Sequence, residues 1–367
     1  MKKERLLPAG IVIALDLLLI AAILCTFSWF HHIKPLWFGL EDDNDLPQTH
    51  FTKPSDPIVN TPTTTPGENE PEEPSDGYDY SGDFGAKFGN LFLKEGESMI
   101  FTDTEYKSED MWITLEEVNT QMVYNGKTYT VQYYVYDIYV RNIENLYTIS
   151  VPSREPIEDM MERTDDKSGP LLKDGLPIAA INGDYWGNDK HTYVAVRNGA
   201  VLRYSDYIES DICVLYYDGT METISPDEYN WNEIAMKSPY QIWNFGPELL
   251  DDQGEMITDF NDFDSYVVNY RHPRASIGYY EPGHYCFVVV DGRSDDSQGV
   301  RMIQMAEIYY ALGCKAAYNF DGGDSAQAYF NGEMYRVDQE RDEDGEDQRK
   351  LYDIVCIGEV RKSGGEE

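Results

Sequence analysis

The sequence predicts an α+β fold: a mixed β-sheet core with few helices, including a β-α-β crossover, preceded by an N-terminal transmembrane helix. Three observations support it. An apolar run of membrane-spanning length opens the chain, short β-type runs dominate from Phe84 onward, and one well-formed helical pattern lies between two apolar runs near the C-terminal end. We therefore divide the chain into an anchor (1–40), a linker (41–83) and a folded domain (84–367).

The first 40 residues are expected to anchor the chain in a membrane. The apolar run from Leu6 to Phe30 is long enough to cross a bilayer, and Lys2, Lys3 and Arg5 before it favour a cytoplasmic N-terminus. Asp16 within the run costs about 2.5–3.5 kcal/mol on insertion scales, which a long Leu/Ile-rich segment can offset. A cleaved signal peptide is the alternative, but no small-residue cleavage site follows the apolar core. We expect a single-pass protein of the cell membrane with an extracellular C-terminal domain.

Charge and composition limit the partners. Residues 41–83 are acidic and rich in Pro and Thr, which predicts an extended, self-repelling spacer. The whole chain carries 67 acidic and 29 basic side chains, a formal net charge of −38. Nucleic acid is excluded as a partner because binding its phosphates needs a basic surface.

A second acidic run, from Asp338 to Asp347, is interpreted as a solvated loop because the ligand spacing of an EF-hand is absent. A divalent cation such as calcium is the alternative there. Otherwise we expect no cofactor, with a divalent cation that bridges a phosphate to the acidic domain as the alternative.

Alternation, turn dipeptides and helix stops define the elements of the folded domain. The expected elements are a strand at Thr128–Val140, hairpins at Thr192–Tyr204 and Ile212–Ile224, and helices at Pro156–Arg163 and Val300–Leu312. Cysteines lie at positions 213, 286, 314 and 356, three of them inside apolar strand-like runs. That setting favours buried thiols over the alternative of two disulfides.

The strand at 285–290, the helix at 300–312 and the strand at 315–320 predict a β-α-β crossover and a parallel pair of strands. Both strands run into Asp-Gly, at Asp291 and Asp321. Because parallel strands end at the same edge of a sheet, we expect Asp291, Arg293, Asp321 and Asp324 to lie near one another.

Other segments offer further polar and aromatic side chains. An apolar run at 177–181 leads into 182–186 (Asn-Gly-Asp-Tyr-Trp), and another segment supplies Arg274. Carboxylates serve as acid, base or nucleophile in glycosyl transfer, arginine binds phosphate as a planar fork, and aromatic rings offer a face to a sugar. One Asp-Gly after a strand is an ordinary turn, whereas several such strand ends, two of them at one edge by the crossover, favour a site.

Two other chemistries fit less well. A serine nucleophile at Ser325 lacks the second glycine of the nucleophile elbow, and nothing places a histidine beside it. The histidines are scattered along the chain, which disfavours a zinc cluster.

The chain resembles the phosphodiester glycosidase family over about residues 175–360. Four segments match family motifs, in the family's order: 182–186 (the Asn-Gly-Gly-Phe-Phe type), 273–278 (Pro-Arg-Thr-Ala-Ile-Gly type), 289–293 (Val-Val-Asp-Gly-Arg) and 319–325 (Asn-Leu-Asp-Gly-Gly-Gly-Ser). Two family glycines are replaced here, by Asp184 and Asp324. Both changes are expected to narrow a pocket and to add negative charge.

The resemblance implies a hydrolase that cleaves the C1–O bond of a sugar whose leaving group is a phosphate, acting on a cell-envelope glycan or a sugar phosphate. By this resemblance, Asp321 or Asp291 is the catalytic carboxylate, and Arg274 and Arg293 hold the phosphate. The residues expected to bind or orient the substrate are Asn182, Gly183, Asp184, Tyr185, Trp186, Asn319, Gly322, Gly323, Asp324 and Ser325.

Two alternatives stay open. The aspartates at 184 and 324 would also suit a non-catalytic, polysaccharide-binding protein of the cell envelope. A glycosidase acting on neutral exopolysaccharide would instead cleave aryl glycosides without depending on the two arginines.

Overall fold

The computed structural model describes residues 83–162, 177–185, 193–251, 253–260, 262–336 and 349–359. The predicted membrane anchor, nearly all of the predicted linker and the acidic run from Asp338 to Asp347 lie outside these residues. Within the described segments, none of the helices combines the length and the apolar character needed to span a bilayer. The anchor and its location therefore stay predictions.

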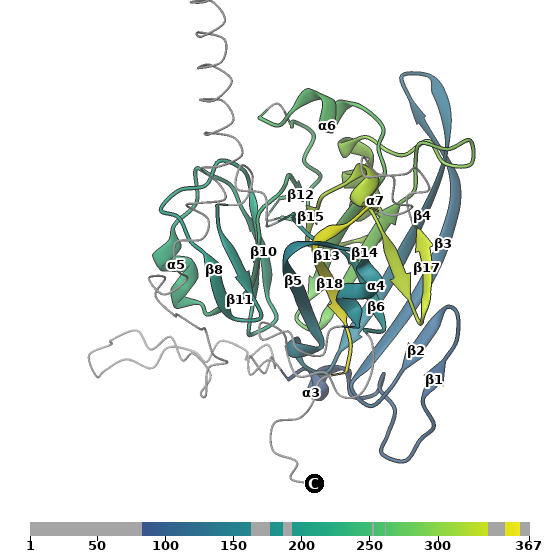
Figure 1. Cartoon of the computed structure of the whole chain (residues 1–367), viewed down its shortest axis with the longest axis vertical. Coiled ribbons are helices and arrows are strands. Elements are labelled where there is room, and N and C mark those ends of the chain that lie inside the picture. Colours follow the sequence, from purple (N-terminus) through teal and green to yellow (C-terminus); the bar gives the residue numbers. More distant parts are fainter. Residues whose placement is uncertain are drawn as a thin grey trace, which may run out of the picture. The chain divides into compact units, whose positions relative to one another are not determined.

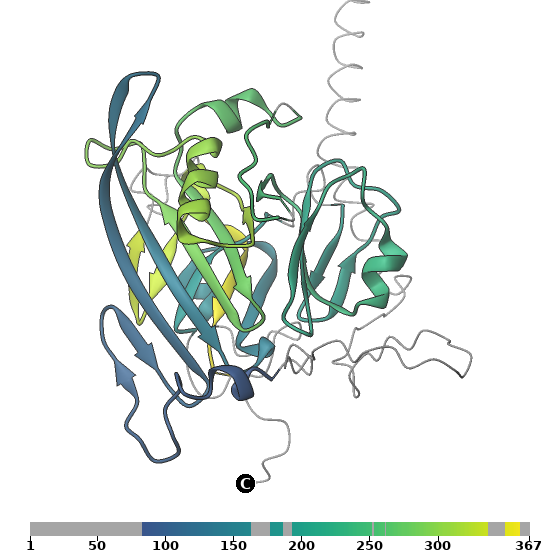
Figure 2. The same cartoon turned by 180° about the vertical axis from the view of Figure 1, so that it is seen from behind.

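Strands dominate the described chain and form three sheets, as the predicted α+β class requires (Figures 1 and 2). The eight-stranded sheet has the order β1 (Ile100–Phe101), β2 (Glu105–Lys107), β3 (Met111–Tyr124), β4 (Lys127–Val140), β14 (His284–Val290), β13 (Arg274–Glu281), β15 (Ala316–Asn319) and β12 (Glu248–Leu250). The first five-stranded sheet has the order β10 (Met221–Ile224), β9 (Ile212–Tyr216), β11 (Pro239–Trp243), β7 (Ala195–Arg197) and β8 (Ala200–Arg203). The second has the order β17 (Glu333–Arg336), β16 (Ala328–Phe330), β6 (Ala179–Asn182), β18 (Leu351–Ile357) and β5 (Leu146–Glu155).

Helices in the described residues are short. They are α3 (Gly85–Phe88), α4 (Ile157–Met161), α5 (Trp231–Met236), α6 (Ser265–Asn269) and α7 (Met302–Leu312), with 3-10 turns η2 (Ile143–Asn145) and η3 (Gly323–Ser325). The predicted strand at 128–140, both hairpins and both helices are confirmed as β4, β7–β8, β9–β10, α4 and α7. Gly313 ends α7 at φ 79°, the left-handed conformation that a glycine stop supplies.

The predicted crossover is present, but the two strands that it joins do not pair with each other. β13 lies between β14 and β15 and is antiparallel to both, so these two strands run in the same direction one position apart. The prediction of a directly bonded parallel pair is therefore wrong. β13 precedes β14 in the chain and pairs with it as a hairpin, so β13 already occupies the place beside β14 when α7 leads the chain back to the sheet as β15. The local pattern of strand, helix and strand does not reveal this.

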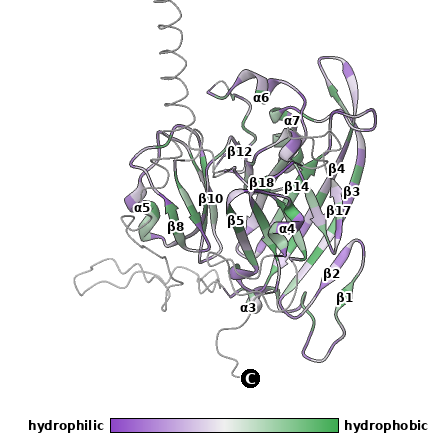
Figure 3. Cartoon of the chain, in the orientation of Figure 1, coloured by the Kyte–Doolittle hydropathy of each residue, from purple (hydrophilic) through white to green (hydrophobic). Residues whose placement is uncertain are grey.

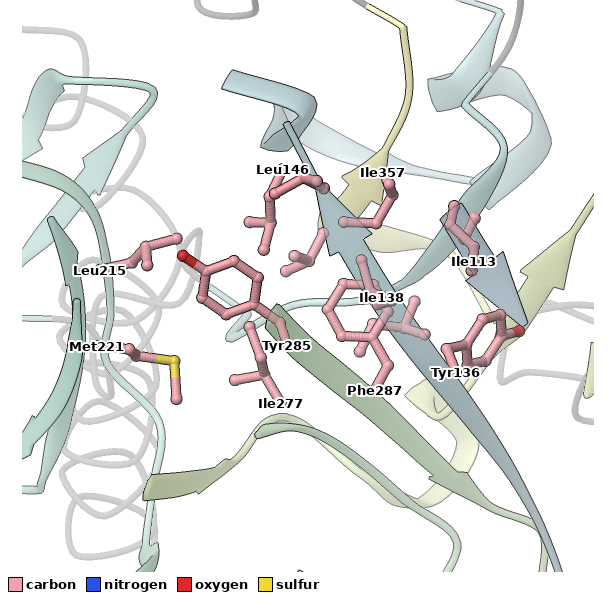
Figure 4. Close-up of a cluster of buried hydrophobic side chains, with 14 of the residues drawn as sticks. Ile113, Tyr136, Ile138, Leu146, Leu215, Met221, Ile277, Tyr285, Phe287 and Ile357 are labelled. Atoms are coloured by element: carbon pink, nitrogen blue, oxygen red, sulfur yellow. The ribbon is translucent and has the colours of Figure 1, made fainter. Parts of the chain in front are cut away.

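The alternating side chains of β14 build two cores, as expected for a strand buried on both faces. Tyr285, Phe287 and Val289 point into the main core, while Cys286, Val288 and Val290 pack in the cluster that contains α7. Side chains from all three sheets meet in the main core, and Figure 4 shows Tyr285 and Phe287 among them. Figure 3 shows the apolar character concentrated along such inner strands.

The four cysteines in the described residues are free thiols, and all of them are buried. Burial raises the pKa of Cys213, Cys286 and Cys356. The interpretation of these residues as buried, apolar thiols is confirmed in this structure.

Candidate active site

The candidate site lies where β13 begins and its two neighbours end. Arg274 pairs with Val290, the last residue of β14, and Ser276 pairs with Asn319, the last residue of β15. Segment 320–325, which follows β15, folds back over the start of β13. The N–H groups of Phe320 and Gly323 donate to the carbonyls of Ala275 and Pro273, each at 2.9 Å.

A cavity of about 600 Å³ opens at this edge. Seven of the residues predicted from the sequence line it: Tyr185, Arg293, Asp321, Gly322, Gly323, Asp324 and Ser325. The described residues that complete its lining are Tyr193, Glu209, Ser210, Phe245, Gly246, Asp262, Phe263, Asp264, Val267 and Arg349. The structure thus gathers carboxylates, arginines and aromatic rings around one space, a combination suited to a charged sugar derivative.

Asp321 is a carboxylate on the cavity lining, and its surroundings shift its pKa. Its Oδ1 accepts the N–H of Gly322 at 2.9 Å. Burial raises the pKa of Asp321, while the hydroxyl of Ser325, the Gly322 N–H and the charges of Arg349 and Arg154 oppose this rise. A carboxyl held between these influences can exchange a proton with a reacting group, as general acid–base catalysis requires.

Arg293 reaches the same cavity and forms an ion pair there with Asp324. The side chains are 37% and 49% exposed, so a ligand in the cavity can reach both. Gly323 lies beneath the guanidinium at φ 63°, and a Cβ on this residue would come within 2.9 Å of Arg293 Nη2. Asp324, where the resemblance implied a glycine, therefore pairs with the arginine that was expected to bind phosphate.

Arg274 has a different place from the one expected of a phosphate ligand. It is buried, and its guanidinium donates to the backbone carbonyls of Val267, Tyr270 and Val300. Burial and the charge of Arg293 lower the pKa of Arg274. Arg274 is not among the described residues that line the cavity. It instead fixes the segment around α6, which supplies Val267 to the cavity wall.

Three further predicted residues bond to backbone at the edge of the sheet. Asn182 Nδ2 donates to the carbonyl of Asp321 at 2.7 Å, and Asn319 Nδ2 donates to the carbonyl of Gly246 at 2.8 Å. Asp291 Oδ1 accepts the N–H of Gly292 at 2.7 Å. The asparagines hold two segments of the cavity lining in place. None of the three is itself among the described lining residues.

Asp184 belongs to a buried charge cluster with Arg197 and Asp353. Arg197 Nη2 lies 2.6 Å from Asp184 Oδ1 and 3.1 Å from Asp353 Oδ2, and all three side chains are at most 1% exposed. Asp184 Oδ2 also accepts the N–H of Asn244 at 2.7 Å, and Asp353 Oδ1 accepts the N–H of Tyr185 at 3.2 Å. The cluster thereby joins β6 and β18 of one sheet to β7 and β11 of another.

Two carboxyls and one guanidinium share this buried space. Burial and the charge of Asp184 raise the pKa of Asp353 well above its usual range, and Arg197 only partly opposes them. A protonated Asp353 can donate to Asp184 and so relieve the repulsion between them. Gly183 is needed beside them, because a Cβ there would lie 2.5 Å from Asp353 Oδ2.

Several residues at the site had no individual signal in the sequence. Arg349 lines the cavity, and the Arg154 guanidinium lies over the rings of Tyr185 and Tyr352 at 5.3 and 5.4 Å. Gly246, which follows β11, carried the one usable signal, a Gly-Pro turn dipeptide after an apolar strand. Trp186, the remaining predicted residue, lies outside the described part of the chain. Across the described segments, no group of three His, Cys, Asp or Glu side chains is placed to hold a metal ion.

Known proteins resemble this chain in sequence and in fold. Residues 176–358 match the phosphodiester glycosidase family. An uncharacterized SPbeta prophage-derived protein of Bacillus subtilis, YomE, is 28% identical over 166 residues, which cover 44% of this chain and 26% of that protein. The chain thus matches about a quarter of the length of this relative.

The fold is also similar to a solved structure. The catalytic domain of zebrafish N-acetylglucosamine-1-phosphodiester alpha-N-acetylglucosaminidase, auto-inhibited by its pro-peptide, superposes with a TM-score of 0.52 and 18% identity. The match covers 67% of this chain and 83% of the zebrafish domain. At this identity the likeness concerns the fold alone.

Proposed function

The chain belongs to the phosphodiester glycosidase family through residues 176–358, and we propose that it hydrolyses the C1–O bond of a sugar-1-phosphodiester. The observation that carries this proposal is the placement of Asp321, Arg293 and Arg349 around one cavity of about 600 Å³. A carboxylate beside two guanidinium groups suits a substrate that joins a sugar ring to a phosphate.

Hydrolysis of this bond needs little assistance from a general acid. A phosphate ester is a weak base and leaves readily, so the protein must mainly hold the anion and stabilise positive charge at C1. In this proposal Arg293 and Arg349 bind the phosphate oxygens and Asp321 faces C1. The C1–O bond breaks with its electrons passing to the phosphate, water adds at C1, and a carboxylate accepts the proton of that water.

Asp324 supports a second candidate function. Its ion pair with Arg293 engages Nη1 of the guanidinium and places a carboxylate beside the arginine, where it opposes the binding of a phosphate. A chain in which the pair stays closed would bind polysaccharide without turnover. The two functions differ in whether free sugar is released.

The location proposed with this function is the outer face of the cell membrane. The apolar run at Leu6–Phe30 and the acidic spacer after it support this placement, with an envelope glycan as the substrate.

Release of free sugar from a panel of hexose- and N-acetylhexosamine-1-phosphate methyl esters tests the proposal. We expect Arg293→Gln to lower kcat/KM by about 10²–10³-fold, the range seen when one charge-stabilising donor is lost. Asp321→Asn should lower it at least as much. Asp291→Asn is the matched control, because Asp291 also precedes a glycine and accepts its N–H.

Polysaccharide binding without release of sugar from any ester would replace hydrolysis by the binding role. Cleavage of aryl glycosides that is unchanged in Arg293→Gln would instead identify a glycosidase of neutral substrates.

A further inference from the structure

A second cavity, of about 500 Å³, adjoins the candidate active site. The two share Glu209, Ser210, Asp262 and Phe263 in their linings. The segment after β10 and the segment before α6 supply further walls, including Asp227 and Phe260. Each cavity alone has the volume of a small-molecule site, so together they exceed what one sugar phosphate fills.

The two cavities differ in charge. Arg293 and Arg349 line the first, whereas no lysine or arginine is among the described residues that line the second. Carboxylates there include those of Asp211, Asp227 and Glu248. A phosphate would be repelled from such a space. The hydroxyl groups of a neutral sugar can instead donate hydrogen bonds to these carboxylates.

Aromatic rings provide apolar contacts along the same path. Phe263 lines both cavities and Phe260 lines the second. Aromatic rings beside carboxylates are well suited to bind a sugar, which presents both apolar faces and hydroxyl groups.

We propose that the substrate is an extended glycan whose phosphate binds at Arg293 and Arg349 and whose further, neutral sugar unit occupies the second cavity. The position of the phosphate rests on the proposed function. Binding of the neutral unit does not, because it depends only on the second cavity. The proposal therefore assigns a polarity to the substrate, with the anionic end in the first cavity and the neutral end in the second.

Chain length tests the proposal during turnover. The full chain is assayed with the methyl phosphodiester of a hexose 1-phosphate and with that of a neutral trisaccharide 1-phosphate. We expect kcat/KM to be at least about tenfold higher for the trisaccharide ester, a gain of one modest binding contact. Asp227→Trp should remove this advantage by filling the second cavity, while turnover of the single-sugar ester stays unchanged.

Glu307→Trp is the matched control, since Glu307 is exposed on α7 and lines neither cavity. It should keep the preference for the trisaccharide. Equal kcat/KM for the two esters, or equal behaviour of Asp227→Trp and Glu307→Trp, would overturn the inference while leaving the proposed function intact.

A binding measurement separates the inference from catalysis altogether. The phosphate-free neutral trisaccharide is titrated calorimetrically into the full chain. Binding that Asp227→Trp weakens at least about fivefold, and that Glu307→Trp preserves, supports the inference even if no ester is hydrolysed. Absence of binding to the wild-type chain would contradict it.

Discussion

Asp184→Ala probes the buried charge cluster that Asp184 forms with Arg197 and Asp353. The change leaves Arg197 with one carboxylate partner and removes the acceptor of the Asn244 N–H. A methyl group cannot replace either contact. Because the side chains are fully enclosed, water cannot restore them without a rearrangement of two sheets.

The expected loss follows from burial. Removing one partner of a buried ion pair costs about 3–5 kcal/mol, because the remaining charge stays desolvated. Asp353 moderates this loss: without the charge of Asp184, its pKa falls, and it can ionise to pair with Arg197 at 3.1 Å. The unpaired Asn244 N–H adds about 1–3 kcal/mol. We therefore expect the free energy of unfolding to fall by about 3–5 kcal/mol in total.

Urea unfolding of the full chain at pH 7, followed by tryptophan fluorescence, measures this change. Lys237→Ala is the control, because it breaks the exposed pair of Lys237 and Glu222, whose side chains are 56% and 37% exposed. Such pairs contribute about 0–1 kcal/mol. A loss below about 1 kcal/mol in Asp184→Ala, equal to that of the control, would refute the role of the cluster as a stabilising link between the sheets.

Three further predictions concern proton binding, the ion pair at the cavity and the thiols. The raised pKa of Asp353 means that the folded state binds this proton more tightly than the unfolded state, so wild-type stability should fall as the pH rises above about 4. Asp353→Asn should flatten this slope in urea unfolding between pH 4 and 7, and an unchanged slope would contradict the assignment. Asp324→Asn should lower KM for a sugar-1-phosphodiester about tenfold, because it releases Arg293 from its ion pair. Asp295→Asn, which makes the same charge change on an exposed loop, should leave KM unchanged. Equal effects of the two variants would indicate that long-range charge, and not the ion pair, controls KM. In a Cys25→Ser background, the four buried thiols should react with a thiol reagent only on unfolding, and fewer than four reactive thiols in the unfolded chain would mean that a disulfide forms.

Local pattern and composition determined the strand-rich class, the hairpins and the two predicted helices. Turn dipeptides and alternating side chains are short-range signals, so they can be read without tertiary information. The Asp-Gly ends of β14 and β15 were also placed at one edge correctly. A helix that packs back along the sheet returns the chain to the side from which the first strand began, so both strands run in the same direction.

The tertiary structure decided which side chains face the cavity. Arg274 and Arg293 both occur in segments that match family motifs. Arg274, the first residue of β13, is nevertheless buried against backbone carbonyls, whereas Arg293 lines the cavity. Arg197 and Asp353, far from Asp184 in the sequence, convert a supposed pocket residue into a link between sheets. Such roles depend on contacts between residues distant along the chain, and these contacts leave no periodic signal in any single segment. The sequence alone thus determined the elements and the class of chemistry, while packing of the three sheets determined which side chains face the cavity.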